Sequence, residues 1–259
     1  MGDYSFRLKY SPWDSAVLGV EAYQLSFNRA LAPKGEENML IKQRLLEIIH
    51  KTSVQFISCR LASAEIKLIQ ELESVGFYTV DQLLTFTYRL GQESPQFTKG
   101  SGVKEASKTD APFIREMHHQ FVQGRFYNDP RISKETAHKV YKKWIEDTLE
   151  GKRADQMFVH ESMDGKVTGF ISCILSQDTE RRPYGIIDLI AVSSGYQGQG
   201  IGRQLLETAV LYFRSHGTSH VQVGTQSSNS AALSLYQNNG FRLHSAETSL
   251  HYWNPLLPK

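Results

Sequence analysis

The sequence is poor in cysteine and has no long hydrophobic run. Its two cysteines, Cys59 and Cys173, lie in apolar stretches typical of strands, which predicts buried, reduced thiols rather than a disulfide or a metal site. No apolar segment approaches the length that crosses a bilayer, and the first ten residues, MGDYSFRLKY, are too polar for a signal peptide. We therefore expect a cytoplasmic protein without stable membrane insertion.

Excess charge of one sign is also missing. Lys and Arg number 29 against 27 for Asp and Glu, without a basic run or a one-sided tail, so a nucleic-acid partner is not expected. The histidines do not follow the spacing of a metal site, and we predict surface or capping roles and no metal ligand among them. They include His118, His119, His160, His216, His220 and His251.

What remains is the composition of a globular protein, with 40% hydrophobic and 22% charged residues. A chain of 259 residues suits one large domain or two small ones. Residues 91–102, GQESPQFTKGSG, are polar and interrupted by Pro95 and glycines, which is linker composition. We predict an amino-terminal domain at 1–91, a linker at 92–102 and a second domain at 103–259.

The second domain is organised around IIDLIAVSSGYQGQGIG, residues 186–202. Its apolar, β-branched first part predicts a buried strand, and apolar residues at helical spacing predict a helix over 203–216. Between them, glycines let the backbone turn tightly and point successive N–H groups at one spot. That spot also faces the positive end of the following helix, which predicts a diphosphate site. Its residues are Gln197, Gly198, Gln199, Gly200, Ile201 and Gly202.

Two other kinds of glycine loop do not fit this turn. It lacks the Gly-Lys-Ser/Thr of a P-loop and the G-x-G-x-x-G of a Rossmann turn. It matches the pattern Q/R-x-x-G-x-G/A, with Gln197, Gly200 and Gly202 at the fixed positions. In this pattern it resembles the acyl-CoA loop of the GNAT superfamily of N-acetyltransferases.

The downstream sequence extends the resemblance. A strand predicted at 220–225 is followed by Asn229, then Tyr236, then Gly240-Phe241 and a closing strand pair, in the order that GNAT proteins show. Asn229 and Gly240 also suit simple helix caps, and Tyr236 suits an aromatic residue of an amphipathic helix. The resemblance rests on all these elements together.

The resemblance implies an α/β (α+β) fold, a mixed central sheet flanked by helices, and acetyl-CoA or another acyl-CoA as co-substrate. It implies that the strand backbone at Ile190, Ala191 and Val192 runs beside the pantetheine and that an N–H near Val192 stabilises the oxyanion. It further implies that Asn229 holds the pantetheine or diphosphate and that Tyr236 protonates the departing thiolate. No metal is implied.

The general base is left open. Asp188 lies four residues before Val192 on the same predicted strand, so the two side chains share a face. Asp188 could remove the proton of the substrate ammonium through water. It could equally belong to a buried polar network or bind a substrate hydroxyl.

The amino-terminal half predicts a related but partial unit. The expected elements are a strand, a turn and a strand over 4–28, a helix over 38–51, a strand over 54–60, a helix over 62–75 and a strand from 78 to Leu90. ESVGF at 73–77 resembles QNNGF at 237–241 as an internal repeat, with Leu72 in the place of Tyr236. Since no glycine loop precedes its helix, this half is expected to pack against and cover the acceptor side.

The remaining elements complete the GNAT order. They are a strand at 103–106, a helix from 109 to Val122, a helix from Ser133 through Leu149, and a hairpin of 157–161 with 166–175 around an Asp-Gly turn.

One branch of the superfamily resembles the whole layout, namely the dTDP-fucosamine acetyltransferases. The likeness lies in WDSAVLGV near the amino terminus, in Arg125-Phe126 of QGRFYNDP and in KKWIEDTLEG around Trp144. It implies transfer of an acetyl or short hydroxyacyl group to the amine of a dTDP-linked amino-dideoxy sugar for surface polysaccharide. Arg125 would pair with the nucleotide diphosphate, Asp188 would line the acceptor site, and Phe126 or Tyr127 would stack on thymine or sugar.

Several alternatives stay open. Phe126 and Tyr127 could instead pack between the domains, and the acceptor could be a protein N-terminus or a small amine. The fold could also be a non-catalytic CoA-binding module. The sequence leaves open whether the amine lies on C3 or C4 of the sugar, and whether the protein is a homodimer.

Overall fold

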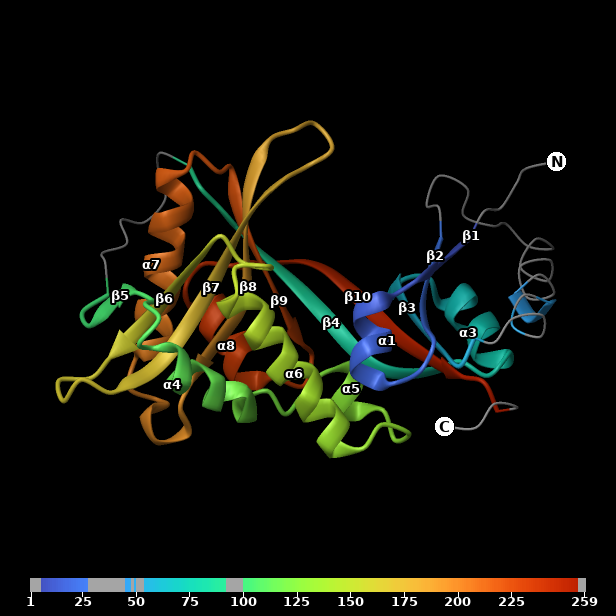
Figure 1. The fold of residues 1–259 in the computed structure, drawn as a ribbon. Coiled ribbons are helices and arrows are strands. Elements are labelled where there is room, and N and C mark those ends of the chain that lie inside the picture. Colours follow the sequence, from blue (N-terminus) through green and yellow to red (C-terminus); the bar gives the residue numbers. More distant parts are fainter. Residues whose placement is uncertain (1–5, 28–44, 48, 50–53, 92–99, 256–259) are drawn as a thin grey trace. The chain divides into compact units, whose positions relative to one another are not determined.

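The computed structural model describes residues 6–27, 45–47, 49, 54–91 and 100–255 (Figure 1). The chain forms two compact units. The first unit comprises Met1–Leu83, Gly124–Ala137 and Ala246–Lys259, and the second comprises Leu84–Gln123 and His138–Ser245. Most of the predicted linker lies outside the described residues, so the boundary at 92–102 stays a prediction.

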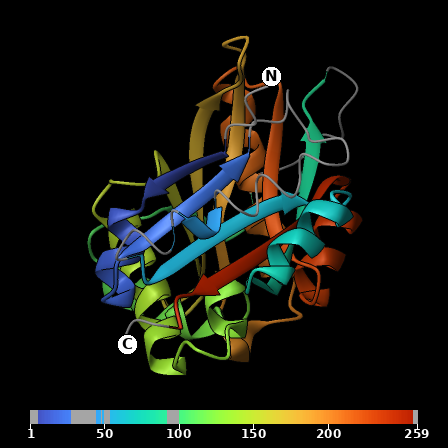
Figure 2. The ribbon, with the colours of Figure 1, turned by 90° about the vertical axis from the view of Figure 1, so that its right-hand side faces the viewer.

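The first unit is a sheet with the strand order β1-β2-β3-β10-β4 (Figure 2). Strands β1 and β2 are antiparallel, β2 and β3 are parallel, and β3 and β10 are antiparallel. Its hydrophobic core gathers residues of β2, β3, α3 and β10. The elements are β1 (Phe6–Tyr10), α1 (Pro12–Leu18), β2 (Ala22–Phe27), β3 (Phe56–Ala62), α3 (Ile66–Ser74), β4 (Tyr78–Arg89), α5 (Arg125–Asn128) and β10 (Arg242–Trp253).

Three predicted elements of this unit differ from the structure. In place of the predicted turn between the first two strands, the structure has the helix α1. This helix has only two turns, which is too short to show a clear helical period of apolar residues in the sequence. Helix α3 begins at Ile66 because Ala62 pairs with Glu247 in the sheet. The predicted helix at 38–51 lies mostly outside the described residues, within which Leu45 and Ile49 are helical and buried.

The division between the units falls within β4, after Leu83, and within β10, before Ala246. The second unit is a mixed sheet, as predicted, in which the remaining parts of β10 and β4 are followed by β9-β8-β7-β6-β5. Strands β5 to β8 pair antiparallel, whereas β8 and β9 are parallel. The elements are β5 (Val103–Glu105), α4 (Ala111–Glu116), η2 (Met117–Gln120), α6 (Lys134–Leu149), β6 (Gln156–Glu161), β7 (Val167–Gln177), β8 (Pro183–Val192), η3 (Ser194–Tyr196), α7 (Ile201–Ser215), β9 (His220–Gln226) and α8 (Ser230–Asn238).

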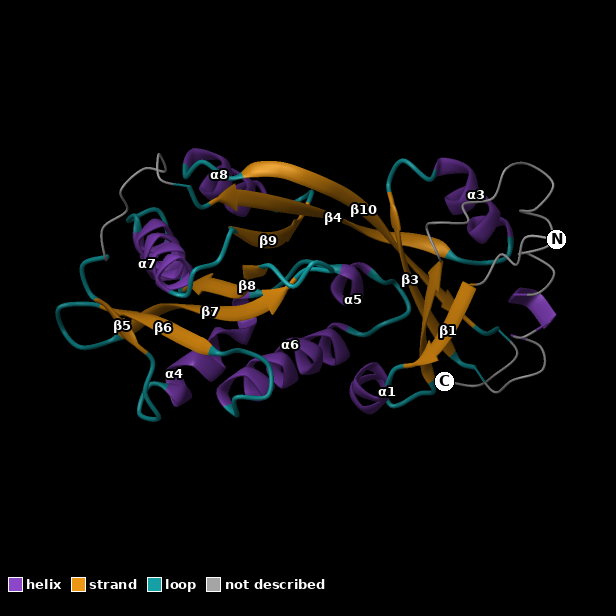
Figure 3. Cartoon of the chain, turned by 90° about the horizontal axis from the view of Figure 1, so that it is seen from above, coloured by secondary structure: helices purple, strands orange, loops and turns teal. Residues whose placement is uncertain are grey.

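Helices cover both faces of this sheet. Helix α7 lies on one side of β6, β7 and β8, and α4 and α6 lie on the other (Figure 3). Alternating residues of β7 therefore enter two different cores: Ile171 packs with Leu205 of α7, and Phe170 packs with Ile145 of α6. A strand covered on both faces explains why the sequences of β7 and β8 are mostly apolar.

Within the second unit, the predicted hairpin of β6 and β7 is confirmed. Two other predictions need correction. The predicted helix through Val122 ends at Glu116 and continues as the 3₁₀ turn η2. The predicted closing strand pair is the single strand β10, twelve residues long. Within the described residues, no helix combines the length and the apolar character needed to cross a bilayer.

The predicted internal repeat has the same local structure in both places. Gly76 and Gly240 each follow a helix with a left-handed φ, of 99° and 84°. An added Cβ would come within 3.3 Å of the Tyr252 ring at Gly76 and within 3.3 Å of the Tyr88 ring at Gly240. Both positions therefore require glycine for conformation and for space.

The residues beside these glycines match as well. Phe77 donates its N–H to the carbonyl of Leu72, and Phe241 donates its N–H to the carbonyl of Tyr236. Leu72 thus occupies the place of Tyr236, as the alignment predicts. The helix therefore ends in the same way in the first unit, but Leu72 provides a hydrocarbon side chain where Tyr236 provides a phenol.

Candidate acyl-CoA site

The glycine turn follows β8 and leads into α7. Gly198 and Gly200 have left-handed φ values of 75° and 81°, and a Cβ at either position would meet nothing within 4 Å. The turn is exposed. Within the described part of the chain, the N–H groups of residues 197–200 donate no hydrogen bond. These free amides, with the positive end of a fifteen-residue helix behind them, have the arrangement that an anion site requires, and the predicted diphosphate site stays a prediction.

Gln197 fixes the shape of this turn. Its Nε2 donates to the carbonyl of Val192 at 3.0 Å and to Oε1 of Gln120 at 3.3 Å. The side chain thus ties the turn back to the end of β8 and to η2. These hydrogen bonds explain why a long amide side chain occupies the first position of the pattern. The role of Gln120 as an acceptor of Gln197 could not be predicted from the sequence.

A gap in the strand pairing lies next to the turn. Strands β8 and β9 pair only from Gly185 with Val221 to Ile187 with Val223, although β8 continues to Val192. The peptide groups at the end of β8 therefore have no β9 partner within the described residues. A ligand with amide groups can add to such an edge as an extra strand. Ile190, Ala191 and Val192 lie along this edge, where the resemblance places the pantetheine.

Three elements meet at Gly202. An added Cβ there would lie 3.4 Å from Leu235 of α8 and 3.9 Å from Val192 of β8. The start of α7, the middle of α8 and the end of β8 are therefore in contact. Because Tyr236 follows Leu235, its helix lies beside the glycine turn and the open edge of β8.

Tyr236 is buried, with its ring centroid 6.0 Å from that of Phe86 and 5.9 Å from that of Phe241. Burial raises the pKa of its hydroxyl, so the phenol keeps its proton at neutral pH. No hydrogen bond joins this hydroxyl to another described residue. The hydroxyl is thus a buried, protonated group without a hydrogen-bond partner among the described residues, and its role as a proton donor stays a prediction.

Asn229 is the N-cap of α8, where its Oδ1 accepts the N–H of Ala232 at 3.2 Å. The capping interpretation is therefore confirmed. Its predicted contact with the co-substrate would have to use the NH₂ group of the side chain.

Asp188 lies at a bulge of β8, since Leu189 pairs with Ser172 but Ile187 pairs with Cys173. Its carboxylate accepts from Arg153 with both oxygens, at 2.9 and 3.1 Å, and from Trp144 Nε1 at 2.9 Å. The Arg153 guanidinium also lies 4.3 Å from the Trp144 ring. This arrangement gives Asp188 a structural role between α6 and β8, and its role as a base stays a prediction.

A pair of variants separates the two roles of Asp188. If the carboxylate mainly anchors Arg153 and Trp144, Asp188→Asn and Arg153→Gln should lower the melting temperature alike and leave the shape of the pH–rate profile unchanged. Each loses a charge-assisted hydrogen bond, worth about 1.5–3 kcal/mol. Thermal melts and pH profiles of kcat/KM provide the measurement. A base role would instead abolish the acidic limb in Asp188→Asn alone.

Three predicted acceptor residues, Arg125, Phe126 and Tyr127, belong to the first compact unit, whereas Asp188 and the glycine turn belong to the second. Arg125 pairs with Asp14 at 3.3 Å and lies 4.2 Å above the ring of Phe126. Phe126 itself is only 4% exposed, which makes it a core residue. Tyr127 is half-buried, with Lys134 Nζ 3.9 Å from its ring centroid.

One prediction about the histidines is wrong. His251 is fully buried rather than at the surface, and its Nδ1 lies 2.7 Å from Asp129 Oδ2. The surface prediction for His119 is confirmed, since this side chain is exposed. His118 and His119 also approach His138 of another helix, a proximity that the spacing in the sequence does not indicate.

Part of the chain matches a known protein family. Residues 118–241 match the Acetyltransferase (GNAT) family. The chain carries a GNAT acetyltransferase domain. This domain is of the CoA-dependent N-acyltransferase type, and it contains the glycine turn, the open edge of β8 and Tyr236.

Individual relatives resemble larger parts of the chain. The dTDP-fucosamine acetyltransferase of Escherichia coli O6:H1 is 26% identical over 198 residues, covering 76% of this chain and 80% of that protein. The spore coat polysaccharide biosynthesis protein SpsD of Bacillus subtilis is 31% identical over 134 residues, 52% of this chain and only 43% of its own length. A GCN5-related N-acetyltransferase of Sphaerobacter thermophilus shares the fold, with a TM-score of 0.61 over 96% of this chain and 76% of that chain at 13% identity.

The glycine turn of this domain provides a direct test of co-substrate binding. We expect Gly200→Val to weaken acetyl-CoA binding by at least about tenfold, because its left-handed φ costs an L-residue roughly 1–2 kcal/mol and the new side chain occupies the space in front of the amides. Isothermal titration with acetyl-CoA measures the change. Gly165→Val, in the left-handed turn of the β6–β7 hairpin, is the matched control and should bind like wild type.

Proposed function

We propose that the protein transfers an acyl group from acyl-CoA to the amine of a dTDP-linked amino-dideoxy sugar, as a step in making surface polysaccharide. The observation that supports this proposal best is the share of the chain that one relative matches. The likeness to the dTDP-fucosamine acetyltransferase covers 76% of the chain, more than residues 118–241 can supply. It therefore includes residues outside the acetyltransferase domain, where an acceptor would be recognised.

The domain's geometry supports the donor half of the reaction. The amides of residues 197–202 would hold the diphosphate of the co-substrate, and the edge of β8 at 190–192 would hold its pantetheine. A backbone N–H near Val192 would donate to the thioester oxygen as negative charge develops there, an effect worth about 3 kcal/mol. The neutral amine would attack the thioester carbon and the C–S bond would break. The nitrogen would lose one proton to a water molecule or a base, and Tyr236 would supply the proton that the thiolate takes up and then recover one from solvent.

The acceptor half rests on the segment around α5. Arg125 is the charged group of this segment, and 25% of its side chain is exposed, so its guanidinium can reach a nucleotide diphosphate. Since Phe126 is buried against His251, stacking on thymine or sugar falls to Tyr127. The guanidinium of Arg125 is partly exposed, pairs with Asp14 and lies over the ring of Phe126.

The decisive experiment is a thiol-release assay with acetyl-CoA and a hydroxyacyl-CoA against dTDP-aminosugars that carry the amine on C3 or C4. A peptide amine and a polyamine are included as competing acceptor classes. We expect release with a dTDP-aminosugar, and stabilisation of the protein by dTDP alone in a thermal-shift titration. Activity confined to the peptide or polyamine would replace the sugar proposal, and binding of acetyl-CoA without turnover of any acceptor would indicate a non-catalytic module.

A further inference from the structure

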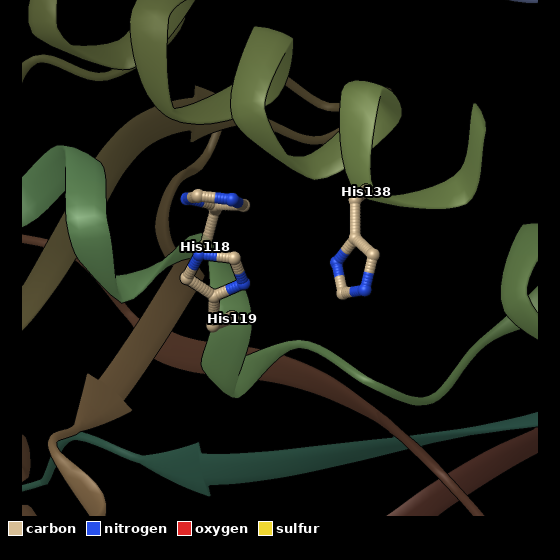
Figure 4. Close-up of side chains that lie close together, drawn as sticks. All are labelled: His118, His119 and His138. Carbon is tan, nitrogen blue, oxygen red and sulfur yellow. The ribbon is translucent and has the colours of Figure 1, made fainter. Parts of the chain in front are cut away.

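Three histidines of the second unit converge at one place. His118 and His119 belong to η2, and His138 belongs to α6 (Figure 4). One ring nitrogen from each lies within 4.8 Å of the others. The ring centroids of His118 and His119 are 3.7 Å apart, and that of His138 lies 6.1 Å and 5.5 Å from them. From this cluster we infer a binding site for a transition-metal ion.

The hydrogen bonding of His118 suits a metal ligand. Its Nδ1 lies 2.8 Å from the carbonyl oxygen of Arg115. A carbonyl can only accept, so Nδ1 carries the proton and the lone pair is on Nε2. Metal-binding histidines are commonly oriented by such a second hydrogen bond. His119 is exposed, which gives an ion access from solvent, whereas His118 and His138 are half-buried.

The donor set selects the class of ion. Three neutral imidazoles favour Zn²⁺, Co²⁺, Ni²⁺ or Cu²⁺, and the absence of carboxylate ligands among the three disfavours Mg²⁺ and Ca²⁺. Zn–N bonds of about 2.0–2.1 Å in a tetrahedron place ligand nitrogens roughly 3.4 Å apart. The ring nitrogens now lie within 4.8 Å of one another, so coordination requires the side chains to rotate until their lone pairs meet at the ion. The fourth position would stay open to water or another ligand.

The two segments that carry the histidines, η2 and α6, already pack against each other. Phe121, just after η2, stacks on Tyr141 of α6 with the rings 5.4 Å apart and 11° from parallel. The same segments reach the acyl-CoA site, because Gln120 accepts from Gln197 of the glycine turn and Trp144 donates to Asp188. An ion bound to the three histidines would therefore brace η2 against α6 next to that site.

The site is tested by metal binding alone, on tag-free, chelator-treated full-length protein. We expect Co²⁺ to produce visible absorption bands that saturate near one equivalent and that Zn²⁺ displaces. His119→Gln and His138→Gln should each weaken Co²⁺ binding by at least about tenfold, since each removes a ligand. Because the readout uses neither acyl-CoA nor an acceptor, it stands apart from the proposed reaction.

The matched control is His216→Gln. His216 is also exposed, and its Nδ1 lies 2.8 Å from the carbonyl of Tyr212, but it does not belong to the cluster of three histidines. This variant should bind Co²⁺ like wild type. Circular dichroism confirms that each variant is folded. The proposal is overturned if wild type shows no saturable binding, or if the doubly substituted His119→Gln/His138→Gln protein binds Co²⁺ as tightly as wild type.

Discussion

Tyr236→Phe should lower kcat by about 10²- to 10⁴-fold, the usual contribution of a general acid, while the dissociation constant of acetyl-CoA stays near that of wild type. The substitution removes one oxygen from a buried ring that packs on Phe86 and Phe241, so the surrounding core keeps its shape. Rapid-quench or steady-state turnover gives the first value, and isothermal titration gives the second.

The physical reason lies in the environment of the phenol. Burial raises the pKa of Tyr236, which keeps the hydroxyl protonated over the neutral range. A proton donor must still hold its proton when the C–S bond breaks, and this hydroxyl makes no hydrogen bond to a described residue that would compete for it. Loss of the proton donor then slows thiolate departure without changing the amides that hold the diphosphate.

Tyr88→Phe is the matched control for this experiment. Tyr88 is also buried and also packs on Phe241, with ring centroids 5.3 Å apart, but it belongs to β4. If removal of any buried hydroxyl from this core were damaging, both variants would lose activity alike. Turnover of Tyr236→Phe within about threefold of wild type would contradict the acid role.

The strand, turn and helix segments of the candidate acyl-CoA site could be predicted well because their signals are local. The glycine pattern, the apolar run of β8 and the cap at Asn229 each lie within a few residues, and backbone geometry fixes what such short segments form. The repeat at Gly76 and Gly240 was readable for the same reason. In both copies one glycine satisfies a left-handed φ and the close approach of a tyrosine ring.

Contacts between distant segments could not be predicted. The partner of Asp188 is Arg153, 35 residues away, and that of His118 and His119 is His138, on another helix. The composition of the compact units is a similar case, because the first unit takes Gly124–Ala137 and Ala246–Lys259 from later parts of the chain. Pattern and propensity describe neighbours along the chain, whereas these groupings depend on the tertiary packing.

The buried network of Asp129 is the largest of these hidden features. Its Oδ1 accepts from the Tyr78 hydroxyl at 2.7 Å and from the Arg131 N–H at 2.8 Å. Its Oδ2 accepts from His251 Nδ1 at 2.7 Å and from Trp253 Nε1 at 3.0 Å. One carboxylate thus joins the strands β4 and β10 to the segment that follows α5.

The charge state of this network follows from burial and hydrogen bonding. Burial alone would raise the pKa of Asp129, but the hydrogen bonds from His251, Trp253 and Tyr78 outweigh it, so the pKa is lowered and the carboxylate stays ionised. Burial lowers the pKa of His251 more than Asp129 raises it, so the imidazole is neutral at pH 7 and donates through Nδ1. Four donors therefore compensate one buried negative charge.

Asp129→Ala should lower the free energy of unfolding by about 3–5 kcal/mol, the usual cost of removing one partner from a buried charged network. Tyr78, His251 and Trp253 each lose the acceptor that the carboxylate provides. Urea unfolding followed by circular dichroism measures the change. Asp164→Asn, an exposed aspartate of the β6–β7 turn, is the control and should stay within about 0.5 kcal/mol of wild type.

Asp129→Asn adds a finer test, because the amide can still accept from Tyr78 and the Arg131 N–H but presents donors to Trp253. We expect a smaller loss than for alanine, about 1–3 kcal/mol, from the mismatched half of the network. If α5 recognises the acceptor, this folded variant should also raise the KM of the dTDP-aminosugar and leave that of acetyl-CoA unchanged, since Asp129 directly follows α5. Equal stability of both Asp129 variants and wild type would show that the network contributes no net stabilisation.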